Sequence, residues 1–277
     1  MSDKYLTKIA GLLRKAETTD NEHEADAFLQ AAQRLATQSS IDLAVARAHT
    51  AVREKRAAPV QRTITIGEPG KRGLRTFVQL FLEIGRANNL TCDIARDSTK
   101  VFAYGFDSDI DGTQALYSSL VVQMVRASDE YIKSRRYAKE MAGRWVRVER
   151  NAGFGRRTSA QEWQQRPVHA STARVNFQQA FAARIGDRLK EAGRQASAAA
   201  VERDRTASTG VEIVLRQRAV ELRDHYLAHS TARGQWRGSS ATASFSELAS
   251  GAGERAGSSA RLGRETAIGG NRPAING

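Results

Sequence analysis

Between residues 59 and 132 the sequence alternates between strand-like and helix-like segments, and this order constrains the fold more than any other feature of the chain. Three short strands are expected, at residues 63–66, 90–95 and 100–104. The polar residues 96–99 predict a hairpin link, and apolar residues recur at helical spacing over 74–88. A long helix is expected to begin at Asp107 or Asp109. The order strand, helix, strand, strand, helix predicts a small, mostly antiparallel sheet packed with long helices, an α+β fold.

The rest of the chain is expected to flank this unit. The predicted organisation is a small helical bundle at 1–52, a linker at 53–60, an α+β domain at 61–232 with a basic insertion at 133–172, and a flexible tail at 233–277. Within the α+β domain, helical periodicity resumes at about Val175 and returns over residues 211–227. The tail is predicted to be flexible because it is rich in Gly, Ser and Arg.

Positive charge is concentrated in one part of the chain. The 277 residues include 43 Lys and Arg and 30 Asp and Glu, a formal net charge of +13. Residues 133–195 hold 15 basic and 5 acidic side chains, a net charge of +10. A charge that served solubility alone would be spread over the chain, whereas a concentrated one attracts polyanions.

The basic segment also contains aromatic residues, among them Trp145 and Trp163. Cations neutralise phosphates, and aromatic rings stack on exposed bases. The predicted nucleic-acid-binding residues are Lys133, Arg135, Arg136, Lys139, Arg144, Trp145, Arg147, Arg150, Arg156, Arg157, Trp163 and Arg166. The glycine-containing run 151–157 is a further candidate for close approach to a phosphodiester. Two alternatives remain open: an ordinary solvated loop, and a basic surface that meets an acidic protein.

His225 and His229 are candidates for a metal site. They have the i, i+4 spacing that places two imidazoles on one helix face, as zinc ligands require. Tyr226 stands where the zinc-protease pattern has its glutamate, so that mechanism lacks its base. The alternative is a pair of partly buried or capping histidines, and the prediction is no metal, no cofactor and no catalytic residue.

Asp107, Asp109 and Asp111 form an acidic cluster at the start of the long helix. Carboxylates at this spacing suit a divalent cation or acid–base catalysis. They also suit the positive end of a helix, which is the interpretation that we favour.

The expected compartment is the cytoplasm. Cys92 is the one cysteine in the sequence, so no intrachain disulfide can form, which fits a reducing environment. The polar N-terminus lacks the apolar core of a signal peptide, and no apolar run reaches the roughly 18 residues of a membrane span. No membrane partner is therefore expected.

Two stretches resemble families of unknown function. The N-terminal residues resemble the domain of unknown function 2786, through Lys8-Ile9, Leu12-Leu13, Lys15-Ala16, Thr18-Thr19, Glu22, Glu24 to Ala27, Ala31 to Leu35 and Ile41-Asp42. The middle resembles a companion, the domain of unknown function 7168, through Leu90 to Cys92, Tyr104 to Asp109 and Phe177 to Leu189. Such proteins occur in bacteria and their phages. The resemblance implies an architecture and assigns no activity.

These observations predict a nucleic-acid-binding accessory protein that has no catalytic activity. The choice between DNA and RNA stays open. One alternative is an adaptor that uses the N-terminal helical unit and the basic segment to bind proteins. Another is a metal-dependent hydrolase built on His225 and His229.

Overall fold

The computed structural model describes residues 58–70, 73–151, 157–207, 211–238 and 245–262, with single residues and short runs between 8 and 35. The predicted α+β architecture is confirmed. A three-stranded antiparallel sheet has the order β1-β3-β2, built from β1 (Val60–Thr65), β2 (Thr91–Ile94) and β3 (Lys100–Gly105). The predicted hairpin between β2 and β3 is present. Ser98 adopts a left-handed conformation there, and the Asp97 carboxylate accepts hydrogen bonds from the backbone and hydroxyl of Thr99.

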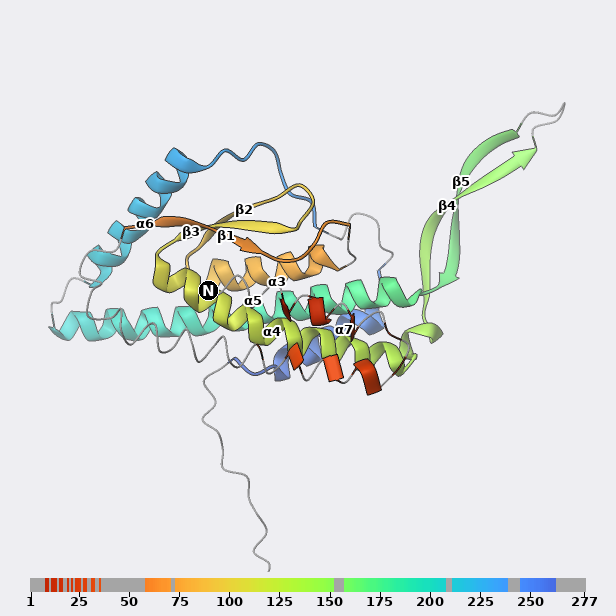
Figure 1. The fold of residues 1–277 in the computed structure, drawn as a ribbon, viewed down its shortest axis with the longest axis horizontal. Coiled ribbons are helices and arrows are strands. Elements are labelled where there is room, and N and C mark those ends of the chain that lie inside the picture. Colours follow the sequence, from red (N-terminus) through yellow and green to blue (C-terminus); the bar gives the residue numbers. More distant parts are fainter. Residues whose placement is uncertain are drawn as a thin grey trace, which may run out of the picture.

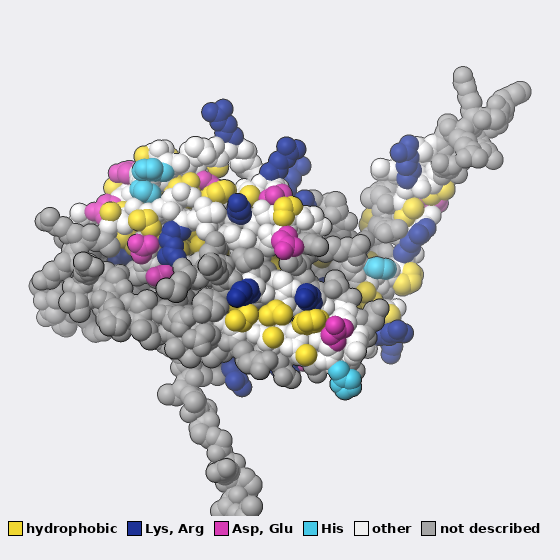
Figure 2. Space-filling model, in the orientation of Figure 1, with side chains coloured by type: hydrophobic (Ala, Val, Ile, Leu, Met, Phe, Trp, Pro, Cys, Tyr) yellow, Lys and Arg dark blue, Asp and Glu magenta, His cyan; other side chains and the backbone are white. Residues whose placement is uncertain are grey.

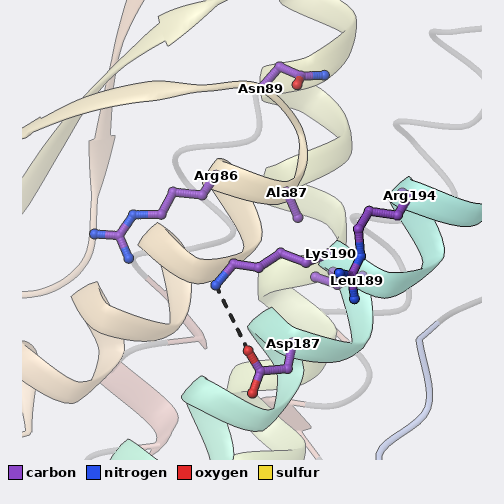
Figure 3. A pocket seen from close by; sticks show the side chains of 8 residues that line it. Arg86, Ala87, Asn89, Asp187, Leu189, Lys190 and Arg194 are labelled. Carbon is purple, nitrogen blue, oxygen red and sulfur yellow. Dashed lines mark ion pairs between the residues drawn. The ribbon is translucent and has the colours of Figure 1, made fainter. Parts of the chain in front are cut away.

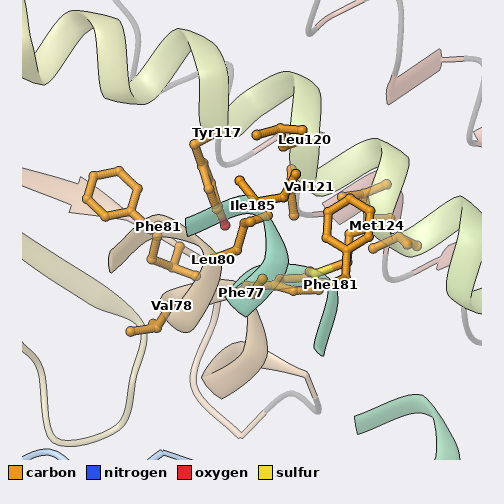
Figure 4. Packing of buried hydrophobic residues seen from close by; sticks show 14 of the residues in the cluster. Phe77, Val78, Leu80, Phe81, Tyr117, Leu120, Val121, Met124, Phe181 and Ile185 are labelled. Atoms are coloured by element: carbon orange, nitrogen blue, oxygen red, sulfur yellow. The ribbon is translucent and has the colours of Figure 1, made fainter. Parts of the chain in front are cut away.

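Three helices pack together beside the sheet: α3 (Leu74–Ala87), α4 (Asp107–Lys133) and α5 (Ala170–Ala207). Their apolar stripes meet in one core (Figure 4), in which the rings of Phe81 and Tyr117 lie edge to face at 5.3 Å. The core also holds a buried polar chain. Thr76 donates to the side chain of Gln178, which in turn donates to Ser128, so each helix contributes one member. Because unsatisfied polar groups are costly in a core, this chain fixes how the three helices align.

The N-terminal segment contributes to the same core. Ile9, Leu13, Ala16 and Ala32 are buried and belong to the cluster formed by α3, α4 and α5. All four lie within the helical bundle predicted at 1–52. Residues 36–52 of that bundle lie outside the described residues.

The basic insertion is a β-ribbon, which the sequence did not predict. After a 3-10 turn, η1 (Arg136–Lys139), strands β4 (Met141–Asn151) and β5 (Arg157–Pro167) pair antiparallel along their whole length. Figure 1 shows this two-stranded ribbon projecting away from the helices. The sequence predicts a basic insertion at 133–172 and assigns no strands to it. The alternation is hard to recognise because polar residues lie on both faces, and Ala142 is the one buried residue among the described side chains of the ribbon.

The helix that follows the ribbon starts earlier than predicted. It begins at Ala170 and not at about Val175. His169 stands before its first turn, and the His169 ring nitrogen Nδ1 lies 2.8 Å from the hydroxyl of Ser171.

Helix α6 (Val211–His229) covers the residues 211–227 that were predicted to be helical. It contacts the sheet. The Asp93 carboxylate on β2 accepts hydrogen bonds from Tyr226 at 2.9 Å and from Ser230, just beyond α6, at 2.7 Å. The ring of Tyr104 on β3 lies edge to face with that of Tyr226. Among the described residues, no helix is both long enough and apolar enough to span a membrane.

The prediction of a flexible C-terminal tail was wrong over residues 245–262, which include helix α7 (Glu247–Ser259). Its glycines lie against α5. A methyl group added to Gly253 would lie 2.1 Å from the carbonyl oxygen of Phe177, and one added to Gly257 would lie 3.0 Å from that of Phe181. Gly253 and Gly257, four residues apart on one helix face, therefore let the backbones of α5 and α7 approach closely. The sequence predicted a flexible tail because a helix rich in glycine and serine has the composition of a linker. The tail residues 263–277 lie outside the described residues.

Candidate nucleic-acid interface

The ribbon is long, narrow and accessible. Each strand has 11 residues, so it spans about 36 Å at the usual rise per residue. The register pairs Trp145 with Trp163 and Arg147 with Gln161. Most of the described side chains in its middle are exposed or half-buried, and the ribbon is joined to the body at its root alone (Figure 1).

Trp163 is held flat against the ribbon. Its side chain is 55% exposed. A methyl group added to Gly143 on the neighbouring strand would lie 2.1 Å from Cζ2 of the indole, so any larger residue at position 143 would displace the ring. The large aromatic surface is therefore presented to solvent in one orientation, at little cost in side-chain entropy on binding.

Arginine dominates the charge of the ribbon. Residues 141–167 contain six arginines and two glutamates. Arg147 and Arg166 are exposed, and Arg166 donates two hydrogen bonds to the amide oxygen of Gln164. Figure 2 shows Lys and Arg side chains along the ribbon and at its root. Planar guanidinium groups match the geometry of phosphate oxygens.

More cations surround the root. Arg135, Arg136 and Lys139 are exposed in and beside η1, and Arg135 has a left-handed backbone with φ of 54°. Lys133 ends α4 and pairs with Asp129 at 3.4 Å. We call Arg135, Arg136 and Lys139 the root cations.

The structure places eleven of the twelve predicted residues, and these fall into three groups. Lys133, Arg135, Arg136 and Lys139 lie at the root, and Arg147, Trp163 and Arg166 have described side chains on the ribbon. Arg144, Trp145, Arg150 and Arg157 are placed by the register of β4 and β5, and Arg156 lies outside the described residues, as does most of the run 151–157. The structure therefore brings the described members together in one projection and its base.

Glu140, which the sequence analysis did not single out, anchors this root. Its carboxylate accepts a hydrogen bond from the Ser246 hydroxyl at 2.5 Å and one from the Glu247 backbone at 2.6 Å. Its carbonyl oxygen accepts from the backbone N–H of Val168 at 2.9 Å, which closes the ribbon. No local pattern could reveal this role, because both carboxylate partners lie more than 100 positions further along the chain.

The histidine pair does not present a formed metal site. The rings of His225 and His229 stack at 4.1 Å between centroids, and His229 Nδ1 lies 2.8 Å from the carbonyl oxygen of His225. Burial and the neighbouring His229 lower the pKa of His225. No group of three or more His, Cys, Asp or Glu suited to a metal ion occurs in the part of the chain that the structure describes. The geometry fits the capping and partly buried interpretation.

The aspartates at the start of α4 are neutralised by arginines. Arg62 on β1 lies 2.7 Å from Asp111 and 3.7 Å from Asp107. Arg218 on α6 lies 3.3 Å from Asp109, and its guanidinium is 3.9 Å from the ring centroid of Phe106. These contacts favour a structural role at the helix N-terminus over a cation site or an acid–base pair.

Cys92 is a structural thiol. It is partly buried in the core on β2. Burial, with a smaller effect of the Asp93 carboxylate, raises the pKa of the Cys92 thiol to about 12. The reactive thiolate is therefore scarce at neutral pH.

Two hollows lie away from the ribbon. The larger, of about 820 Å³, is lined by Arg86, Lys190 and Arg194, with Asp187 beside them (Figure 3). Its cations have acidic partners: Glu83 lies 2.9 Å from Arg86 and 3.5 Å from Lys190, and Glu191 pairs with Arg194. The second, of about 640 Å³, is lined by Phe106 and Arg218 among others. Because Glu83 and Glu191 offset the charge of Arg86, Lys190 and Arg194, the larger hollow is poorly suited to bind an anion.

Comparisons with known proteins add a family match at the N-terminus. A family model described as "Protein of unknown function (DUF2786)" matches residues 4–43, which confirms the N-terminal resemblance. Neither curated proteins nor solved structures gave a significant match to the chain. The family match covers none of the ribbon, so the interface rests on its own geometry.

Proposed function

We propose that this protein binds nucleic acid through the β4–β5 ribbon and the root cations, as an accessory protein that performs no catalysis. The observation that carries the proposal is the form of the basic segment. Arg147, Arg166 and Trp163 lie on a projection of about 36 Å, and among its described side chains Ala142, at the root, is the one that belongs to the buried core. Such a projection can enter a groove or follow a strand, which a flat basic patch cannot do.

Two kinds of contact support this function. Arginine and lysine neutralise phosphates and release counterions, and this is the main source of affinity that does not depend on sequence. Trp163 adds an aromatic surface on which bases can stack. In this proposal Arg147, Arg166 and the root cations meet the backbone, together with Arg144, Arg150, Arg156 and Arg157, while Trp163 and Trp145 meet bases.

The geometry of the root allows a clean test. The backbone N–H of Val168 donates to the carbonyl oxygen of Glu140 at 2.9 Å, so the two ends of the ribbon lie side by side. Residues 141–167 can therefore be replaced by a short Gly-Ser turn that joins Glu140 to Val168. We expect the shortened protein to remain folded, with a small loss of stability because the buried Ala142 is removed, and to lose at least tenfold in affinity for mixed oligonucleotides. Equal affinity of the two proteins would exclude the ribbon as the binding element.

The adaptor remains the second candidate, because the family match lies in the N-terminal helical segment and not in the ribbon. A protein partner with an acidic surface would then contact the same cations. Capture of one protein by the full chain, unaffected by nuclease and lost on removal of residues 141–167, would support that function over nucleic-acid binding.

We also propose a relation of the middle of the chain to the domain of unknown function 7168. The supporting stretches fall on β2, on the junction of β3 with α4, and on α5. A single, partly buried Cys92 with a raised pKa is consistent with a reducing cytoplasm in a bacterium or one of its phages.

A further inference from the structure

The two faces of the ribbon differ in chemistry. Alternate residues of a strand share a face, and directly paired residues lie on the same face. The register therefore places Arg147, Gln161 and Gln165 on one face with Trp163, and all four side chains are exposed. We call Arg147, Gln161 and Gln165 the reading face; by register Glu149 shares it, nearer the tip.

The opposite face is less suited to recognition. Val146, Val148 and Ala160 lie there and are half-buried, together with the exposed Glu162. On this face Arg166 donates two hydrogen bonds to Gln164, and the register also places Arg144 and Arg150 here. The exposed amides of Gln161 and Gln165 thus lie with the guanidinium of Arg147 on the reading face.

The side chains of the reading face match base edges. Arginine binds guanine O6 and N7 through two hydrogen bonds, and glutamine binds adenine N6 and N7 in the same way. A surface that served phosphates alone would need cations and would gain little from exposed glutamines. Arg147 and Gln161 lie directly opposite each other, so the two can address neighbouring bases.

The dimensions of the ribbon favour one groove of undistorted DNA. The major groove of B-form DNA is about 12 Å wide and admits a two-stranded ribbon, whereas the minor groove, at about 6 Å, takes a ribbon only when the duplex is widened or bent and presents a degenerate pattern of base edges. The major groove of an A-form RNA duplex is too deep and narrow for side chains to read. A strand of about 36 Å also matches one turn of B-form DNA, about 34 Å.

We infer that the reading face lies in the major groove of double-stranded DNA and that Arg147 and Gln161 determine sequence preference, while the root cations contact phosphates. This inference rests on the proposed function, and it narrows the ligand from nucleic acid in general to duplex DNA read by base edges.

The test is a selection with the full-length protein from a double-stranded DNA library with a random centre, followed by affinity measurements on the selected duplex and on a scrambled one. We expect Gln161→Ala and Arg147→Ala each to reduce the ratio of these affinities about 5- to 150-fold, the range for losing one bidentate base contact. Gln164→Ala is the matched control, because it removes the same side chain from the opposite face of β5, and it should leave the ratio within about twofold.

The outcomes separate the two proposals. Equal binding of the selected and scrambled duplexes, or a preference that Gln161→Ala and Arg147→Ala leave intact, would overturn the major-groove inference and leave the proposed function standing. Tighter binding to single-stranded DNA or to duplex RNA of the same sequence than to duplex DNA would also overturn the major-groove inference and leave the proposed function standing. Failure to bind any of these nucleic acids at low salt would overturn both.

Discussion

Glu140 accepts a hydrogen bond from the hydroxyl of Ser246, 106 positions further along the chain, at 2.5 Å. Glu140 is the last residue before β4, and Ser246 is the N-cap of α7, whose hydroxyl also accepts from the backbone of Ala249. The base of the ribbon and the start of the C-terminal helix are therefore joined through one carboxylate. Gly253 and Gly257 of α7 in turn lie against α5.

The first prediction concerns this junction. Glu140→Ala should lower the free energy of unfolding by about 1–2 kcal/mol, because Ser246 and the backbone of Glu247 both lose their acceptor. Glu140→Gln should cost less, since its one amide oxygen can still accept from one of the two donors. Chemical denaturation measures both. The control is Glu162→Gln, which alters an exposed carboxylate on the ribbon and should leave stability unchanged within about 0.5 kcal/mol.

The second prediction concerns the packing of α7 on α5. Gly253→Ala should destabilise the protein by about 1–3 kcal/mol, because its methyl group would meet the carbonyl of Phe177. Gly251→Ala, in the same helix, meets nothing closer than the end of the Arg255 side chain at 3.4 Å. It should be neutral or stabilising by up to about 1 kcal/mol, since alanine is the better helix former. Equal losses in the two variants, measured by thermal unfolding, would contradict the close helix contact.

The third prediction concerns the aromatic surface of the ribbon. Trp163→Ala should weaken binding of single-stranded DNA by about 1–3 kcal/mol, the usual contribution of one stacked base, and should leave the fold intact. Gly143→Ala should weaken it as well, because the added methyl group displaces the ring. Trp236→Phe is the control, since Trp236 donates to Ser98 at the sheet and lies outside the ribbon. Fluorescence titration measures the affinity of all three variants. If Trp163→Ala binds single-stranded DNA as tightly as the parent protein, Trp163 does not stack on bases.

The fourth prediction concerns pH. Burial and His229 lower the pKa of His225 in the folded protein below the value of about 6.5 in an unfolded chain. Between the two values the unfolded chain binds more protons, so stability falls as the pH drops through about 6.5 and the loss is complete below the folded pKa. His225→Asn should show a weaker dependence of the unfolding temperature on pH in this range. The exposed His23→Gln should behave like the parent, and the same pH profile in all three proteins would refute the assignment.

The sequence predicted the elements that bury one face. Residues 74–88 and 107–132 carry apolar stripes because α3 and α4 each present one side to the core. The ribbon alternates weakly: Val146 and Val148 share a half-buried face, but arginines occur on both faces and obscure the pattern. Helix α7 was missed for a related reason: its contact surface is made of glycine and alanine, which carry no hydropathy signal and resemble a linker.

The sequence predicted which residues form the candidate site but not that they lie on a two-stranded ribbon. Charged and aromatic residues can be counted along a sequence, so the sequence alone predicts Arg147, Trp163 and Arg166 as binding residues. Strand register decides which of them share a face, and the acceptor role of Glu140 depends on a contact with α7. Neither follows from local spacing, because both depend on pairing between distant segments.

The central claim is that the ribbon binds nucleic acid, and its most direct test is the salt dependence of affinity for a mixed-sequence DNA duplex. The full chain and the protein lacking residues 141–167 are compared over a range of salt concentrations. For the full chain, log affinity should fall linearly with log salt at a slope of about −4 or steeper, as expected when roughly five or more phosphates are contacted. The shortened protein keeps the root cations alone, so it should bind more weakly and with a clearly shallower slope. A full chain without measurable affinity at low salt, or two proteins with the same slope, would contradict the account.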